Sequence, residues 1–389
     1  MDPLNRRRFL HSLALVGVSV AAGGLAACGK KDASASSASA APSPTDALTF
    51  GFIFNGPTSD LGYNQAHWLG SQALKPFPWA KVVEEASVPE TAAAQESMRN
   101  MIHLDGAKVI FPTSFGHYDP HTLKVAAENP AVEFFHCGGL WEEGKHPTNV
   151  GTFIGFIDEV EYLSGMVAGA ATKNGKLGFI AAKPIPQVLR NINSFTLGVR
   201  RIRPDATVQV IFTGDWVMPV REAEAANSLA NQGIDVLTAH LGAPRTVVQT
   251  AEERGIHSCG YQHDQSSIAP KGFLTGAEWN WGTVYTQYAQ WIHEGKSVAK
   301  GTIPRRVTGT FKDNFCKLSP FGPSVTAETK AKVAEVEKAL IDGSFQVYRG
   351  EIRNNQGKVV IPSGTTIAIT DVELDRMDWL VEGTIGNTA

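Results

Sequence analysis

Short apolar runs rich in β-branched and aromatic residues alternate with longer amphipathic stretches from residue 47 onward. Short runs of this kind are typical of buried strands, and the longer stretches have the period of helices. Strands are expected at 47–54, 80–85, 107–111, 132–136, 175–181, 208–212, 236–240 and 257–261. Helices are expected at 64–74, 91–104, 121–128, 160–172, 190–202, 221–232 and 246–254.

This alternation predicts an α/β protein, because strand–helix–strand units build parallel sheets with helices on their faces. The pattern restarts near residue 159, so it indicates two similar lobes that face each other. A chain of this length also exceeds what one hydrophobic core usually serves. The C-terminal part differs, with a charged helix at 327–340 and a hairpin signal at 354–357 inside the alternating stretch 345–369.

The N-terminus has the pattern of an export signal. Three arginines at 6–8 precede an apolar, small-residue run that ends at Cys28. The ending Leu25-Ala26-Ala27-Cys28 resembles the lipobox of bacterial lipoproteins, which implies a lipid on Cys28 and a signal peptide over residues 1–27. The arginines also resemble a twin-arginine signal, so the export route stays open. Residues 28–47 are Ser, Ala, Pro and charge, which predicts a disordered tether.

Composition narrows the function. The formal net charge is −3, which argues against a nucleic-acid partner, since such partners require a basic face. Besides Cys28 the chain has Cys137, Cys259 and Cys316, which allow at most one disulfide among them. The spacing of Cys and His indicates no metal site, and no cofactor is expected.

In open parallel sheets, ligands bind at the carboxyl ends of the strands. The loops there are rich in aromatic and polar residues. They are 55–64, 113–118, 137–141, 214–219, 240–244 and 262–265.

Two catalytic interpretations fail. Residues 139–145 have the spacing of a phosphate-binding loop, but Glu142 and Glu143 would face the phosphate and His146 replaces the hydroxyl that binds magnesium. A calcium-dependent nucleoside hydrolase would need a cluster of aspartates near the first strand, where Asp60 stands alone. No nucleophile elbow is present either, so an enzyme is not expected.

The chain resembles the basic membrane protein family of ABC-transporter substrate-binding lipoproteins. The resemblance runs from about Leu48 to Gly386 and is carried by the first loop, by the pattern Glu278-Trp279-Asn280-Trp281-Gly282 and by further landmarks. The landmarks are 59–65, 161–165, 175–181, 183–198, 231–236, 260–265, 278–282 and 377–383.

The resemblance implies a two-lobed type I periplasmic-binding-protein fold with a crossed hinge. Lobe 1 is expected at 48–155 plus about 280–318, and lobe 2 at 156–279 plus about 319–389. It also implies an exported, membrane-anchored monomer that binds a purine base or purine nucleoside and hands it to an ABC transporter permease. A ligand that contacts both lobes favours their closure.

Family positions can be carried over residue by residue. Tyr63 and Trp216 match the aromatic positions that stack on the base from opposite lobes, and Asn64 follows Tyr63 as in the family. Asn55 stands where relatives hold a base-binding carboxylate, and Asp264 matches an acidic position after the strand that ends at residue 261. The competing interpretations are core packing for the two aromatic residues and turn capping for Asp264.

The sugar positions differ from the nucleoside-binding pattern. Gln262 and Trp279 stand where relatives hold the ribose with Asp and Lys. This favours a free base, with Asn280, His240 and Asp264 reading its edge. In the alternative interpretation, Trp279 points into the core of a lobe. Two further functions are a purine nucleoside-binding protein of the same transporter class and an exported nucleoside hydrolase. A cytoplasmic sugar-type repressor is disfavoured by the leader.

Overall fold

The structure is a computed structural model that describes residues 47–388 of the chain. The predicted signal peptide, the lipidation site at Cys28 and almost all of the tether therefore lie outside the described residues. Across residues 47–388, none of the helices is long and apolar enough to cross a membrane.

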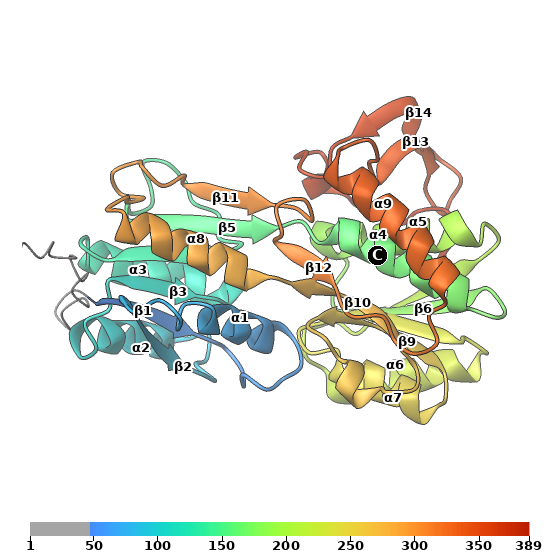
Figure 1. Ribbon diagram of the computed structural model, residues 1–389, viewed down its shortest axis with the longest axis horizontal. Coiled ribbons are helices and arrows are strands. Elements are labelled where there is room, and N and C mark those ends of the chain that lie inside the picture. Colours follow the sequence, from blue (N-terminus) through green and yellow to red (C-terminus); the bar gives the residue numbers. More distant parts are fainter. Residues whose placement is uncertain (1–46, 389) are drawn as a thin grey trace, which may run out of the picture. The chain divides into compact units, whose positions relative to one another are not determined.

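Sheet A has the strand order β11-β5-β4-β3-β1-β2, and every neighbouring pair in it is parallel (Figure 1). Its central strands β1 and β3 are largely apolar and, except for Leu48, buried, because helices cover both faces of the sheet. The strands are β1 (Leu48–Ile53), β2 (Ala80–Glu85), β3 (Val109–Pro112), β4 (Glu133–Cys137), β5 (Val150–Gly155) and β11 (Arg306–Gly309).

Sheet B has the order β12-β10-β9-β8-β6-β7-β15, in which only the pair β12 and β10 is antiparallel. The crossover to sheet B precedes residue 316, since β12 pairs with β10 and not with sheet A. The strands are β6 (Lys176–Ala181), β7 (Thr207–Phe212), β8 (Val236–His240), β9 (His257–Gln262), β10 (Phe273–Trp279), β12 (Cys316–Leu318) and β15 (Thr384–Ile385).

The helices flank the two sheets, as the alternating pattern predicts for every one of them except α8, which was not expected. Helix α8 packs on α1 beside sheet A, and α4, α5 and α9 pack together beside sheet B (Figure 1). With sheet A lie α1 (Tyr63–Gln72), α2 (Ala92–His103), α3 (Leu123–Glu128) and α8 (Trp281–His293). With sheet B lie α4 (Asp158–Ala171), α5 (Pro186–Ile202), α6 (Pro219–Asn231), α7 (Arg245–Glu253) and α9 (Ala327–Ile341).

The chain passes between the two sheets three times: from β5 to α4, from β10 to α8 and from β11 to β12. Backbone hydrogen bonds join these crossovers. Phe156 N–H donates to Gly309 O at 2.9 Å, and Asn280 N–H donates to Phe315 O at 2.8 Å. The three crossovers therefore behave as one hinge.

The hinge holds an acidic side chain, Glu159, which is 5% exposed and accepts a hydrogen bond from Phe311 N–H. Burial raises its pKa from 4.5 to about 7. The unfolded chain releases this proton at a lower pH than the folded chain does. This group therefore lowers the free energy of unfolding as the pH rises from 4.5 to about 7. Glu159→Gln, which keeps the acceptor oxygen, is expected to raise the melting temperature at about pH 8 and to leave it unchanged below about pH 4.5. Equal effects at both pH values would contradict this.

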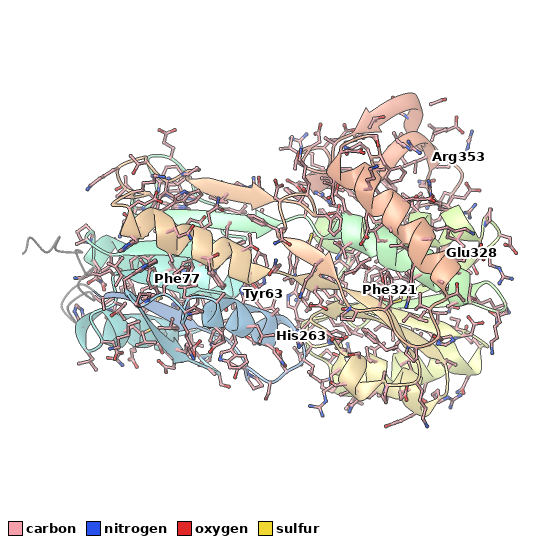
Figure 2. The ribbon with its side chains drawn as sticks, viewed as in Figure 1. Tyr63, Phe77, His263, Phe321, Glu328 and Arg353 are labelled. Atoms are coloured by element: carbon pink, nitrogen blue, oxygen red, sulfur yellow. The ribbon has the colours of Figure 1, made fainter. Side chains whose placement is uncertain are left out.

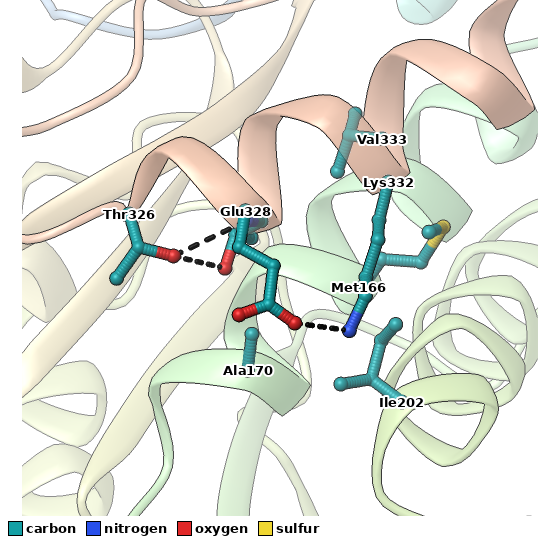
Figure 3. Close-up of a pocket in the computed structure, with 8 residues that line it drawn as sticks. Met166, Ala170, Ile202, Thr326, Glu328, Lys332 and Val333 are labelled. Atoms are coloured by element: carbon teal, nitrogen blue, oxygen red, sulfur yellow. Dashed lines mark hydrogen bonds and ion pairs between the residues drawn. The ribbon is translucent and has the colours of Figure 1, made fainter.

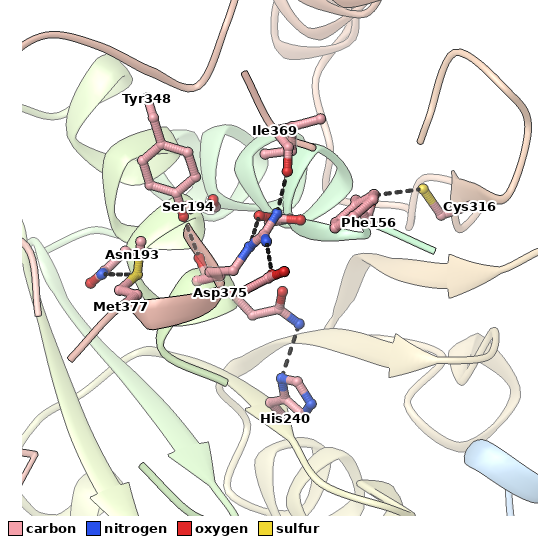
Figure 4. A network of polar contacts seen from close by, with 12 residues as sticks. Phe156, Asn193, Ser194, His240, Cys316, Tyr348, Ile369, Asp375 and Met377 are labelled. Carbon is pink, nitrogen blue, oxygen red and sulfur yellow. Dashed lines mark hydrogen bonds and ion pairs between the residues drawn. The ribbon is translucent and has the colours of Figure 1, made fainter. Parts of the chain in front are cut away.

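The C-terminal segment folds onto α4 and α5. Strands β13 (Tyr348–Arg353) and β14 (Val359–Ile367) form an antiparallel hairpin around the predicted turn, and β15 extends sheet B. A buried ion pair joins this segment to both helices: Arg190 Nε lies 2.8 Å from Asp158, and the guanidinium also contacts Asp375 and the carbonyl of Ile369 (Figure 4). Lobe 2 is thus completed by the C-terminal segment.

Candidate functional site

Loops at the carboxyl ends of strands in both sheets meet, as the sheet topology predicts. The loop after β1 contacts the loops after β8 and β9. Tyr63 N–H donates to Gly242 O at 2.8 Å, and Gln265 Nε2 donates to Leu61 O at 2.6 Å. Tyr63 and His263 lie on these neighbouring loops in Figure 2.

Asp60 organises the loop after β1. Its carboxylate accepts hydrogen bonds from the backbone N–H groups of Gly62, Asn64 and Gln65, and from the side chain of Asn64. Asn64 Oδ1 in turn accepts from Gly56 N–H. Asn64 is buried and shapes the loop, whereas Asn55, two residues past the end of β1, is exposed.

Tyr63 begins α1 and has a half-buried ring. Its hydroxyl donates to Thr113 O at 2.6 Å, and the edge of its ring packs on His67 at 4.4 Å between centroids. Burial raises the pKa of the hydroxyl, and the nearby Cys137 raises it further. The ring is therefore held against lobe 1 in a fixed orientation.

Trp216 lies on the loop after β7, in lobe 2, and is 36% exposed. Its ring centroid is 6.0 Å from that of His240, and its carbonyl accepts a hydrogen bond from Gly242 N–H at 2.8 Å. About a third of this side chain is therefore open to solvent.

His240 ends β8 and is buried with both ring nitrogens engaged. Asn191 Nδ2 lies 2.9 Å from His240 Nδ1, and Tyr261 Oη lies 3.2 Å from His240 Nε2. Burial lowers the pKa of His240 to about 3, so the ring is neutral. The Asn191 amide donates to Nδ1 and also to Tyr261 Oη at 3.3 Å, which assigns the ring proton to Nε2. Tyr261 oxygen thus accepts twice, and the side chain is 1% exposed.

Gln262 and Trp279 bind each other. Trp279 Nε1 donates to Gln262 Oε1 at 2.7 Å, and Gln262 Nε2 donates to Leu241 O at 2.9 Å. Gln262 has φ +78°, a left-handed backbone that is unfavourable for a residue other than glycine. Such strain persists only where the surroundings fix the residue, and here the bonds of its amide do so.

The ring of Trp279 is 7% exposed and stacks on Trp281 at 4.6 Å. A Cβ atom at Gly155 would lie 2.5 Å from this ring, so Trp279 fills the space beside the first crossover. Asn280 donates to Thr283 and to the carbonyl of Asn314. These two residues therefore contact the hinge.

Asp264 accepts a hydrogen bond from Ser266 N–H at 2.8 Å and so caps the turn after β9. This is the contact that the turn-capping interpretation describes. The structure therefore brings Tyr63, Trp216 and His240 to the meeting of the lobes, whereas Asn55 is exposed and Asp264 caps a turn.

Three further residues near the site, Asn191, Tyr261 and Glu161, were not predicted from the sequence, although all three lie in the landmark segments. Glu161 is completely buried, and neither carboxylate oxygen has a hydrogen-bond partner among residues 47–388. Burial raises its pKa well above the usual range, with Asp158 as the second cause. Glu161 therefore places a buried carboxyl near Tyr261, whose pKa is raised by burial and further by this carboxyl.

The chemistry of this region suits recognition of a planar, polar-edged molecule. It offers the aromatic rings of Tyr63 and Trp216 beside a buried polar network around His240. In the part of the chain that the structure describes, no group of His, Cys, Asp and Glu is arranged to bind a metal ion, and the cysteines are free. A separate surface groove of about 320 Å³ lies between α9 and α4, where Glu328 pairs with Lys332 (Figure 3). It is remote in sequence from the loops at the strand ends.

A family model described as ABC transporter substrate-binding protein PnrA-like, named Bmp, matches residues 47–343. The chain belongs to this family. The resemblance found in the sequence is thereby confirmed, and PnrA-like proteins are substrate-binding proteins of ABC transporters.

Three relatives of this PnrA-like chain are informative. A purine-binding protein of Brucella abortus is 32% identical over 339 residues, which cover 86% of this chain and 92% of the relative. A putative ABC transporter glucose-binding protein of Haloferax volcanii is 30% identical over a match that covers 79% of this chain and 76% of the relative. An ABC transporter nucleoside-binding protein of Lactococcus lactis is 25% identical and covers 87% and 97%.

Solved structures show the fold. A solute-binding protein of an ABC transporter from Conexibacter woesei superposes with a TM-score of 0.65 at 22% identity, covering 77% of this chain and 98% of that one. A solute-binding protein from Aeropyrum pernix superposes with a TM-score of 0.62 at 18% identity, covering 79% of this chain and 93% of that one. This PnrA-like protein has the two-lobed type I periplasmic-binding-protein fold, with a parallel sheet in each lobe and a crossed hinge.

Proposed function

We propose that this protein is an extracytoplasmic binding protein that delivers a purine base to an ABC transporter permease. The observation that carries the proposal is the 32% identity with a purine-binding protein over nearly the whole of both chains. The two aromatic rings, Tyr63 and Trp216, belong to opposite lobes, as a sandwich around a planar base requires. Each stacking pair contributes about 0.5–1.5 kcal/mol beyond burial.

The proposal favours a free base over a nucleoside. Ribose hydroxyls are bound best by charged groups, because charge-assisted hydrogen bonds are about twice as strong as neutral ones. Here the corresponding positions are Gln262 and Trp279, whose polar groups are already bonded to each other and to Leu241. A ribose at this place would leave its hydroxyls unpaired, at about 1–3 kcal/mol for each buried group.

Titration calorimetry tests this directly. Adenine, guanine, hypoxanthine and xanthine are compared with their ribosides, and the tightest free base is expected to bind at least about tenfold more strongly than its riboside, a difference of about 1.4 kcal/mol. Equal or tighter binding of any riboside would return the protein to the nucleoside-binding group. Glucose is included because of the Haloferax relative, and binding of glucose alone would replace the purine proposal.

The same samples distinguish binding from hydrolysis. A binding protein returns its ligand intact, so chromatography after long incubation with a nucleoside is expected to recover the nucleoside unchanged. Free base in excess over protein would favour the exported hydrolase instead. Because the lobes close on the ligand, the melting temperature is expected to rise with ligand concentration.

The membrane anchor is proposed from the sequence at Cys28. Cys28→Ser removes the thiol that takes the lipid, so the variant is expected in the soluble fraction after lysis without detergent, while the wild type sediments with membranes. Western blotting of the fractions measures this. Serine at residue 34, in the tether, is a matched control, and Ser34→Ala is expected to stay with the membrane. Retention of the Cys28→Ser variant on membranes would refute the lipoprotein proposal.

A further inference from the structure

Gly242 connects the backbones of the two proposed stacking residues. Its N–H donates to the carbonyl of Trp216 at 2.8 Å, in the same lobe. Its carbonyl accepts from the N–H of Tyr63 at 2.8 Å, across the gap between the lobes. One residue therefore links both aromatic positions through two main-chain hydrogen bonds, which allow less variation in spacing than side-chain contacts.

The two lobes approach each other too closely here for a side chain. A Cβ atom built on Gly62 would lie 2.4 Å from Gly242 O and 2.7 Å from the Cα of Ala243. Gly62 has φ −149°, which lies outside the left-handed region, and the space at this contact admits no Cβ atom. A methyl group at residue 62 would push the lobes apart.

Side chains on both sides of this contact extend it. Gln265 is completely buried and donates to Leu61 O at 2.6 Å. Gln65 Nε2 lies 3.3 Å from His263 Nε2. The bonds of Tyr63, Gln265 and Gln65 across the lobes are called here the interlobe latch.

Every donor and acceptor of the interlobe latch belongs to the chain, so its stabilising energy requires no atom of a solute. Asp60 lies behind the latch, and four donors from its own loop occupy the carboxylate. The latch therefore brings no unpaired charge into the contact between the lobes. The loop that carries Tyr63 is held in shape before it meets Gly242.

We infer that the interlobe latch, in which Gly242 joins the backbones of Tyr63 and Trp216, holds the lobes together independently of solute. The latch itself does not depend on which solute binds; only the stacking role of the two rings rests on the proposed function. The closed arrangement of the lobes is thus stabilised partly by contacts within the chain itself, and a bound solute stabilises it further.

Hydrogen–deuterium exchange of the full chain without added solute tests the latch. Segments 61–66 and 241–244 contain the amides of Tyr63 and Gly242 and are expected to be protected in the wild type. Gly62→Ala is expected to raise exchange at the amide of Tyr63 about tenfold or more, because it opens the contact, whereas the amide of Gly242 keeps its bond to Trp216 within lobe 2. His263→Ala, which removes only one side-chain contact, is expected to raise exchange at the Tyr63 amide roughly two- to threefold.

Gly169→Ala is the matched control. Its new Cβ atom would also meet a backbone carbonyl, that of Val199 at 2.6 Å, but between α4 and α5 inside lobe 2. It is expected to lower the melting temperature while the two latch segments stay protected. Full exchange of both segments in the wild type, or no change in Gly62→Ala, would overturn the inference. Because no purine is present, this result is independent of whether the purine proposal holds.

Discussion

Trp216→Ala is expected to weaken binding of the proposed purine about 30- to 100-fold, or roughly 2–3 kcal/mol, while the ligand-free protein keeps its melting temperature. The affinity falls because the variant loses both the stacking and the apolar surface that the indole would bury against the base. Stability is retained because the ring is 36% exposed and belongs to no hydrophobic core cluster among the described residues. Calorimetry and thermal unfolding on the same preparation measure the two quantities.

The neighbour of Trp216 provides the control. Val217 is on the same loop and 58% exposed, so Val217→Ala is expected to change neither affinity nor stability appreciably. Tyr63→Phe tests the opposite ring: it keeps the aromatic surface and loses only the bond to Thr113, so it is expected to bind more tightly than Tyr63→Ala. A Trp216→Ala variant with normal affinity and a large loss of stability would show that the indole serves packing.

Arg190→Met is expected to lower the free energy of unfolding by about 3–5 kcal/mol, the usual cost of leaving one partner of a buried ion pair alone. The side chains of Arg190 and Asp158 are 4% and 3% exposed, so solvent cannot replace the lost contact. Methionine keeps much of the length and volume of the side chain, which limits the effect of an empty cavity. Urea unfolding followed by circular dichroism measures the change.

Arg200→Met on the same helix is the control for this prediction. Arg200 lies 4.0 Å from Glu382, and the two side chains are 28% and 59% exposed. Exposed pairs of this kind contribute about 0–1 kcal/mol, so little change is expected. Equal losses in the two variants would mean that helix α5 tolerates no change at either position, and the ion pair would not explain the effect of Arg190.

The sequence predicted the elements whose own residues specify them. Buried parallel strands such as β1 and β6 are continuous apolar runs, and each predicted strand exists within a few residues of its expected bounds. Strands β5, β10, β11, β12 and β15 were not predicted. Strand β10 contains a glycine and a glutamate, and β12 and β15 have three and two residues, so their pairing depends on neighbours distant in sequence.

At the candidate site, the sequence indicated which loops meet but not where their side chains point. Trp279 was expected beside the ligand, and its indole donates to Gln262 and stacks on Trp281. His240 was expected to read a base edge, and both of its nitrogens are occupied by Asn191 and Tyr261. Such orientations depend on tertiary contacts that no local pattern contains. Whether these residues touch a ligand remains a prediction.

The threefold crossing of the chain has a consequence for how the protein forms. Strand β11 completes sheet A at Gly309, whereas sheet B draws strands from Lys176 to Ile385. A chain that emerges from its N-terminal end can therefore finish the first lobe while the second still lacks β12 and β15. Contacts so distant in sequence slow folding and leave apolar surface exposed meanwhile. We expect the half-formed second lobe to be the species that requires a chaperone.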